Sequence, residues 1–183
     1  MAVLSIAESR KQGSDCRGKP GYPQTSSPRY SWLIACLLVL LAPLTSVFAD
    51  AQVDRLLAGP DAPGGVVFEI VESDDAALEV LIPRVREAIE RIRQKFPHTD
   101  FAVVSHGSEQ FALQSQYRQE LAPIHQQVQA LVADDVPVHV CETHASWYGV
   151  TPEDFPEYVD VAPSGPSQVN LYRELGYHLI LVD

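Results

Sequence analysis

The apolar run V-P-V-H-V at residues 136–140 leads directly into Cys141 and the polar segment E-T-H at residues 142–144. A short, continuous apolar run is typical of a strand that is buried on both faces, as in a parallel sheet. In open α/β sheets, ligands bind beyond the carboxyl ends of the strands, and Cys141 falls at such an end. This junction therefore predicts a parallel sheet and a candidate site beyond the carboxyl end of the strand at residues 136–140.

Similar apolar runs on both sides of this one predict four more strands, at residues 66–71, 101–107, 158–162 and 177–182. Helices are expected between the strands, because apolar residues recur at three- and four-residue steps, and Ser164 can cap the last helix. The two clearest helices span residues 78–96 and 121–133, whereas residues 108–119 are ambiguous. The alternation predicts an α/β fold, a three-layer α/β/α domain with a five-stranded, mostly parallel sheet.

The first 49 residues differ in composition from the rest of the chain. Basic residues precede an apolar stretch at residues 32–44, and V-F-A at residues 47–49 supplies the small residues of a signal-peptidase site. The apolar stretch is shorter than the roughly 20 residues that span a bilayer. We therefore expect a signal peptide at residues 1–49, with an uncleaved membrane anchor as the alternative, and export to the periplasm. A flexible arm is expected at residues 50–65 and the folded domain at residues 66–183.

Charge narrows the classes of partner for the folded domain. The leader holds five of the 13 basic residues and two of the 24 acidic ones, so the remainder has a net charge of −14. A domain this acidic repels phosphate backbones and anionic lipids. We expect no nucleic-acid partner and no membrane contact beyond an uncleaved anchor, whereas a cationic protein partner would suit the domain.

Removal of the leader would also remove Cys16 and Cys36, which leaves Cys141 as the single cysteine. One cysteine cannot form an internal disulfide, so in an exported protein it indicates a free thiol or an intermolecular bond. A buried cysteine that only packs in the core is the alternative, because cysteine is among the most buried residue types.

Several segments together resemble the DsrE/DsrF-like family, and especially its small stand-alone members. They are F-A-V-V-S-H-G (101–107), the run from V-P-V-H-V-C to T-P-E-D-F (136–155), V-A-P-S-G (161–165) and L-G-Y-H-L-I (175–180). The resemblance covers about residues 66–182 and implies a compact, flavodoxin-like α/β domain that assembles into homotrimers or hexamers. Members with known roles pass sulfur between proteins as a cysteine persulfide, which implies donor and acceptor proteins as partners. The family's reactive cysteine maps onto Cys141, although most members are cytoplasmic and this chain carries an export signal.

Cys141 is the candidate for chemistry, because a thiolate is the nucleophile that sulfur transfer requires. His106, at the end of a strand, and His144, three residues after the cysteine, are candidate supports, although either can equally be a structural or solvated histidine. A zinc site made from these three residues would lack a second cysteine, so no metal is expected. No cofactor is implied, because Ser164 and Gly165 are explained by a helix cap without a glycine-rich loop.

Two hypotheses of function follow. In the first, Cys141 accepts a sulfane sulfur and relays it to an acceptor, without turnover of a small substrate. In the second, the domain is a non-enzymatic, oligomeric binding or assembly module, and Cys141 is structural. Burial of the thiol distinguishes them, because relay needs a sulfur that opens onto a pocket.

Overall fold

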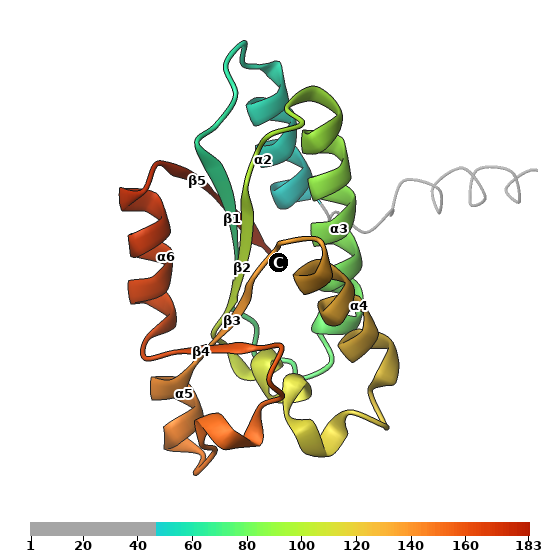
Figure 1. Cartoon of the computed structure of the whole chain (residues 1–183), viewed down its shortest axis with the longest axis vertical. Helices are drawn as coiled ribbons and strands as arrows, with labels where there is room; N and C mark the ends of the chain where they lie inside the picture. Colours follow the sequence, from blue (N-terminus) through green and yellow to red (C-terminus); the bar gives the residue numbers. More distant parts are fainter. Residues whose placement is uncertain (1–46) are drawn as a thin grey trace, which may run out of the picture. The chain divides into compact units, whose positions relative to one another are not determined.

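The computed structural model describes residues 47–183. The signal peptide or anchor predicted for residues 1–49 lies outside the described residues, except for its last three positions. Among residues 47–183, no helix combines the length and the apolar character needed to cross a membrane. The described residues form one sheet with helices on both of its faces (Figure 1).

The sheet has five strands in the order β4-β3-β2-β1-β5, and every neighbouring pair is parallel. The predicted α/β class and five-stranded sheet are confirmed, and the sheet is parallel throughout rather than mostly parallel. Its strands are β1 (Gly65–Ile70), β2 (Phe101–Ser105), β3 (Val138–Cys141), β4 (Asp160–Ala162) and β5 (Tyr177–Val182). Because the strands are parallel, their carboxyl ends lie at one edge of the sheet.

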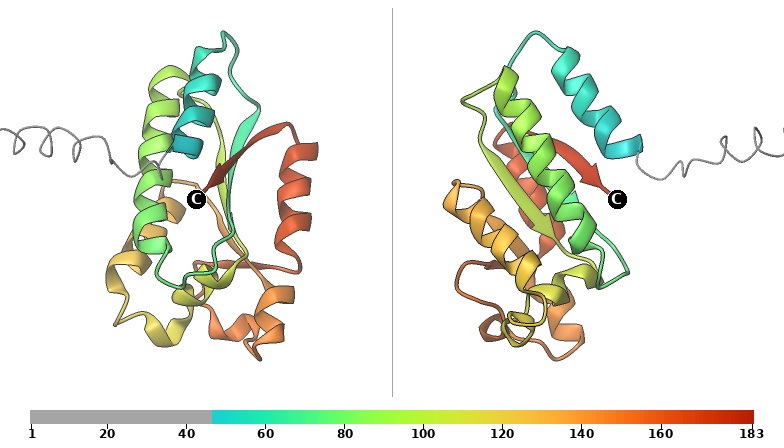
Figure 2. Two further views of the ribbon diagram at one scale, coloured as in Figure 1. Left: turned by 180° about the vertical axis from the view of Figure 1, so that it is seen from behind. Right: turned by 90° about the vertical axis from the view of Figure 1, so that its right-hand side faces the viewer.

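Among residues 47–183, three helices cover one face of the sheet and one helix covers the other, which produces the predicted three layers (Figures 1 and 2). The helices α2 (Val47–Ala58), α3 (Leu78–Lys95) and α4 (Ala122–Ala133) lie on the first face, and α6 (Gly165–Glu174) lies on the second. Along β1, Val66 and Phe68 belong to the larger core under α3, whereas Val67 packs with Val169 of α6. Residues of β1 therefore alternate between the two cores, as the pleat of a strand requires.

Residues 50–58 are part of helix α2, which corrects the expectation of a flexible arm at residues 50–65. Val53 is 1 % exposed and joins the larger core, so the helix is anchored by burial of apolar surface. Arg91 of α3 forms ion pairs with Asp50 and Asp54 on α2, and α2 runs beside α3 (Figure 2). Residues 59–64 link α2 to β1.

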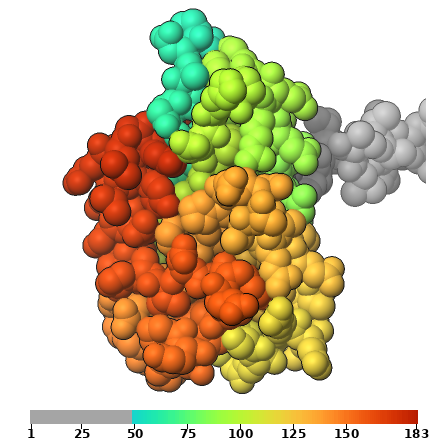
Figure 3. Space-filling view, viewed as in Figure 1, coloured from blue at the N-terminus to red at the C-terminus, as the bar shows by residue number. Residues whose placement is uncertain are grey.

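The shorter elements gather beyond the carboxyl ends of the strands. The ambiguous segment after β2 forms two 3₁₀ helices, η2 (Ser108–Leu113) and η3 (Ser115–Tyr117). A short helix, α5 (Glu142–Trp147), follows β3 directly, and η4 (Pro152–Asp154) precedes β4. In the space-filling view, the yellow segment after β2 and the orange segments after β3 occupy the same end of the domain (Figure 3).

Candidate functional site

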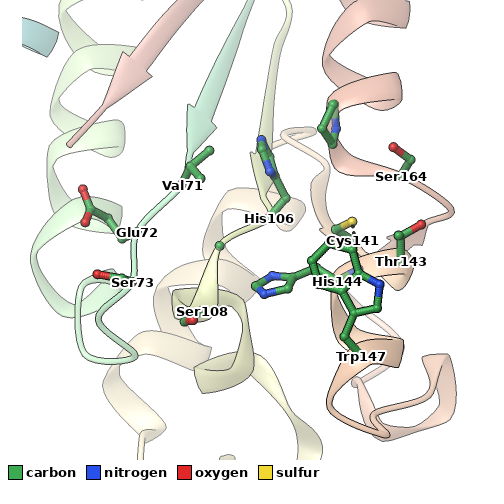
Figure 4. Close-up of a pocket in the computed structure, with 12 residues that line it drawn as sticks. Val71, Glu72, Ser73, His106, Ser108, Cys141, Thr143, His144, Trp147 and Ser164 are labelled. Atoms are coloured by element: carbon green, nitrogen blue, oxygen red, sulfur yellow. Dashed lines mark hydrogen bonds between the residues drawn. The ribbon is translucent and has the colours of Figure 1, made fainter.

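A cavity of about 540 Å³ lies where β1, β2 and β3 end and where α6 begins. Figure 4 shows that its walls come from four separate stretches of the chain, which meet only because the sheet is parallel. All three candidate residues, His106, Cys141 and His144, line this cavity. The other lining residues are Val71, Glu72, Ser73, Gly107, Ser108, Thr143, Trp147, Ser164 and Pro166.

Cys141 is the last residue of β3 and the residue that precedes α5. Its Sγ accepts a hydrogen bond from the backbone N–H of His144 at 3.4 Å, so the sulfur caps the start of the helix. The residue is only 4 % exposed, and the thiol is not in a disulfide. Backbone N–H groups at a helix start are suited to stabilising a sulfur anion once it has formed.

His144 contacts the cysteine through its backbone and not through its imidazole. Its ring Nδ1 instead lies 2.9 Å from Nε2 of Gln110. The ring also packs against Phe111, Trp147 and Tyr148, with centroid distances of 5.5, 5.4 and 5.4 Å. These contacts fix the orientation of the imidazole at the wall of the cavity (Figure 4).

His106 is held by a partner that sequence reasoning missed. Its Nε2 lies 2.8 Å from Oε1 of Glu69, and the two side chains are 12 % and 15 % exposed. Glu69 is the one charged residue in the apolar strand β1, and this exception was the signal available in the sequence. Gly165 makes room for the ring, since a Cβ at this position would lie 2.4 Å from Cβ of His106.

Two adjacent, fully buried polar residues of η2 were also missed. Glu109 accepts hydrogen bonds from the backbone N–H of Glu72 at 2.7 Å, the hydroxyl of Ser105 at 2.7 Å and the backbone N–H of Gly107 at 3.0 Å. Oε1 of Gln110 accepts the backbone N–H of Cys141 at 2.7 Å. Glu109 thus connects the ends of β1 and β2, and Gln110 connects η2 to the end of β3.

One hydroxyl group at the cavity, that of Ser164, has a structural role. Oγ of Ser164 accepts the backbone N–H of Ser167 at 3.4 Å and so caps α6, as expected. Across residues 47–183, no three or more His, Cys, Asp or Glu side chains are grouped in a way that could hold a metal ion. The site therefore offers a thiol, two oriented imidazoles and backbone donors, and its lining also includes Glu72 and the hydroxyl residues Ser73, Ser108 and Thr143.

No family model matches the sequence, and no curated protein matches it. Among solved structures, the chain is similar to a protein of unknown function, MTH1491 from Methanobacterium thermoautotrophicum. The two chains are 24 % identical with a TM-score of 0.51, and the match covers 63 % of this chain and 96 % of the other. This likeness supports the α/β fold. The protein is therefore classed as an α/β domain with an all-parallel, five-stranded sheet.

Proposed function

We propose that this protein carries sulfane sulfur as a persulfide on Cys141, in the manner of the DsrE-like proteins that its motifs resemble. The observation that carries the proposal is the position of the Cys141 thiol at the wall of a cavity of about 540 Å³, beyond the carboxyl ends of the strands. The N–H of His144, which points at Sγ from 3.4 Å, supports the same chemistry.

The transfer step is a nucleophilic displacement at sulfur. The thiolate of Cys141 attacks the outer, sulfane sulfur of a donor persulfide, and a new S–S bond forms to Sγ. The S–S bond within the donor breaks at the same time, and the donor leaves as a thiolate that takes up a proton from water. Relay is the reverse reaction with an acceptor thiolate, so electrons balance without an added oxidant.

The proposal includes donor and acceptor proteins, export to the periplasm, and assembly into a homotrimer or hexamer. Apolar surface for assembly is present on α6, at its C-terminal end and on the edge strand β5. Leu171 of α6 and Leu175, the residue that follows α6, are 48 % and 64 % exposed, and Leu181 of the edge strand β5 is 47 % exposed. Burying such side chains between subunits would favour association.

A binding or assembly module with a structural cysteine is the second candidate. The observation in its favour is that Cys141 is only 4 % exposed, as expected for a cysteine that serves to pack and to cap α5. The two functions differ in whether a sulfur donor can reach Sγ through the cavity.

Intact mass spectrometry of the purified protein tests the proposal. We expect polysulfide to add one sulfur atom per chain, reductant to remove it, and the variant Cys141→Ser to gain none. Because the sequence also contains Cys16 and Cys36, the added sulfur must be assigned to Cys141 by peptide mass in protein that keeps its leader. A folded protein that gains no sulfur at Cys141 would favour the binding module.

A further inference from the structure

Gln110 has a fully buried side chain that contacts both Cys141 and His144. It is 0 % exposed, and it belongs to η2, which precedes Cys141 by about thirty residues in sequence. Its Oε1 accepts the backbone N–H of Cys141 at 2.7 Å, and its Nε2 lies 2.9 Å from Nδ1 of His144. A single amide thus connects the backbone of the cysteine to the imidazole of the histidine.

The chemistry of these partners fixes the amide in one orientation. A backbone N–H can only donate, so the atom of Gln110 that faces Cys141 must be the carbonyl oxygen. The NH₂ group of Gln110 then faces the imidazole of His144, and it can only donate. Nδ1 of His144 must therefore accept, and an accepting nitrogen carries no proton.

We infer that Gln110 is a positioning residue that holds His144 as the neutral tautomer with its proton on Nε2. Within residues 47–183, no hydrogen-bond partner occupies Nε2 of His144. The ring lines the cavity and is packed between Phe111, Trp147 and Tyr148, so its orientation is fixed. Nε2–H is thus a donor available to an acceptor in the cavity.

The functional consequence rests on the proposed sulfur chemistry. A persulfide on Cys141 and the thiolate that leaves the donor are both anionic acceptors, and each is stabilised by an N–H donor. In this role a neutral His144 donates a hydrogen bond to sulfur and does not act as a base. The Nε2–H of His144 therefore favours ligands that bring a hydrogen-bond acceptor to this part of the cavity.

Nitrogen NMR of the histidine rings measures the tautomer directly in the purified protein. The chain has six histidines, and the variant His144→Gln assigns the signal of His144 among them. We expect a protonated Nε2 and an unprotonated Nδ1 in the unsubstituted protein at neutral pH. In Gln110→Glu an ionised carboxylate can only accept, so we expect Nδ1 of His144 to become protonated.

The matched control is Gln126→Glu, which makes the same change of charge at an exposed position on α4. We expect it to leave the His144 signal unchanged. A proton on Nδ1 in the unsubstituted protein would overturn the inference, as would a His144 that keeps an unprotonated Nδ1 in folded Gln110→Glu with an ionised carboxylate. If Gln110→Glu does not fold, the spectrum of the unsubstituted protein still decides, because the amide orientation permits only one tautomer.

The NMR measurement and the sulfur-uptake measurement test the two claims independently. If the protein takes up no sulfur but His144 carries its proton on Nε2, the role of Gln110 in orienting the ring stands and only the sulfur-relay proposal is wrong. If the protein takes up sulfur but Nδ1 of His144 is protonated, the sulfur-relay proposal stands and the inference about Gln110 is wrong. A change in tautomer is also a readout that loss of packing alone would not produce.

Discussion

Nε2 of His106, the residue after β2, lies 2.8 Å from Oε1 of Glu69 in β1, although the two residues are 37 positions apart. This contact holds the imidazole of His106 on the α6 side of the sheet, under Gly165. His144 is held instead by Gln110, at the other side of Cys141. The two histidines at the cavity thus have separate partners, and neither imidazole hydrogen-bonds the sulfur within the described residues.

The close approach of α6 to His106 makes Gly165 sensitive to substitution. In Gly165→Ala, the new Cβ would lie 2.4 Å from Cβ of His106, so the helix or the ring must move. We expect the free energy of unfolding to fall by about 1–3 kcal/mol, as for other overpacked sites. Urea unfolding measures the change. Asn170→Ala, at an exposed position on the same helix, should change stability by less than about 0.5 kcal/mol. Equal effects in the two variants would contradict the predicted clash.

Glu109 connects the ends of β1 and β2, so its replacement by an amide should destabilise the site. The carboxylate accepts from Glu72, Ser105 and Gly107. In Glu109→Gln an NH₂ group must face at least one of these donors, which leaves buried donors unpaired. We expect a loss of about 1–3 kcal/mol in the free energy of unfolding. Glu157→Gln, at an exposed position before β4, is the matched control, and a loss of similar size there would argue against the network.

Cys141 should tolerate serine better than alanine, because its side chain caps α5. Serine keeps an acceptor for the N–H of His144, whereas alanine removes it. We expect Cys141→Ala to be less stable than Cys141→Ser by about 0.5–2 kcal/mol, as for other helix caps. Thermal or urea unfolding of the two variants provides the comparison. If alanine is tolerated as well as serine, the sulfur does not act as a cap.

Because His139 is buried, we expect the stability of the protein to depend on pH. Burial lowers its pKa below 6.5, and nearby Asp160 only partly offsets this effect. Its Nε2 lies 2.8 Å from the hydroxyl of Tyr172, and the neutral ring can form this hydrogen bond. The unfolded chain takes up a proton at a higher pH than the folded protein does. The contribution of His139 to stability is therefore fully present above pH 6.5 and is lost as the pH falls below that value.

Unfolding by urea between pH 7.5 and about pH 5, above the range in which carboxylates titrate, measures this dependence. We expect His139→Gln to reduce the slope but not to abolish it, because burial also lowers the pKa of His125. His178→Gln, at an exposed position on β5, is the control for the substitution of a histidine by glutamine. A slope that is insensitive to His139→Gln would contradict the assignment.

Most of the sheet could be predicted from the sequence because buried parallel strands leave a strong local pattern. The apolar runs located all five strands to within about two residues, and the three central strands β1, β2 and β3 are buried almost throughout. Helix α2 was missed because its segment is followed by a run rich in Gly, Pro and Asp. The spacing of Val53, Leu56 and Leu57 was the helical signal, and these residues pack against the sheet and α3.

The candidate site was only partly predictable. Cys141, His106 and His144 were expected at one edge because parallel strands end together, and all three line one cavity. Their partners could not be found in the same way, because Glu109 and Gln110 lie in a 3₁₀ segment without apolar periodicity. Their burial is stabilised in part by partners that are distant in sequence, Glu72 for Glu109 and Cys141 for Gln110. Contacts of this kind depend on the fold and not on local pattern.

Transfer of labelled sulfur tests the central claim most directly. The protein is loaded with isotopically labelled polysulfide, separated from the excess, and mixed with a small acceptor thiol, and the intact mass is followed with time. The sulfur-relay account predicts that one labelled sulfur atom resides on Cys141, leaves the protein and appears in the acceptor, and that Cys141→Ser neither gains nor passes on any label. A folded protein that takes no label at Cys141, or that keeps it in the presence of excess acceptor, would contradict the account.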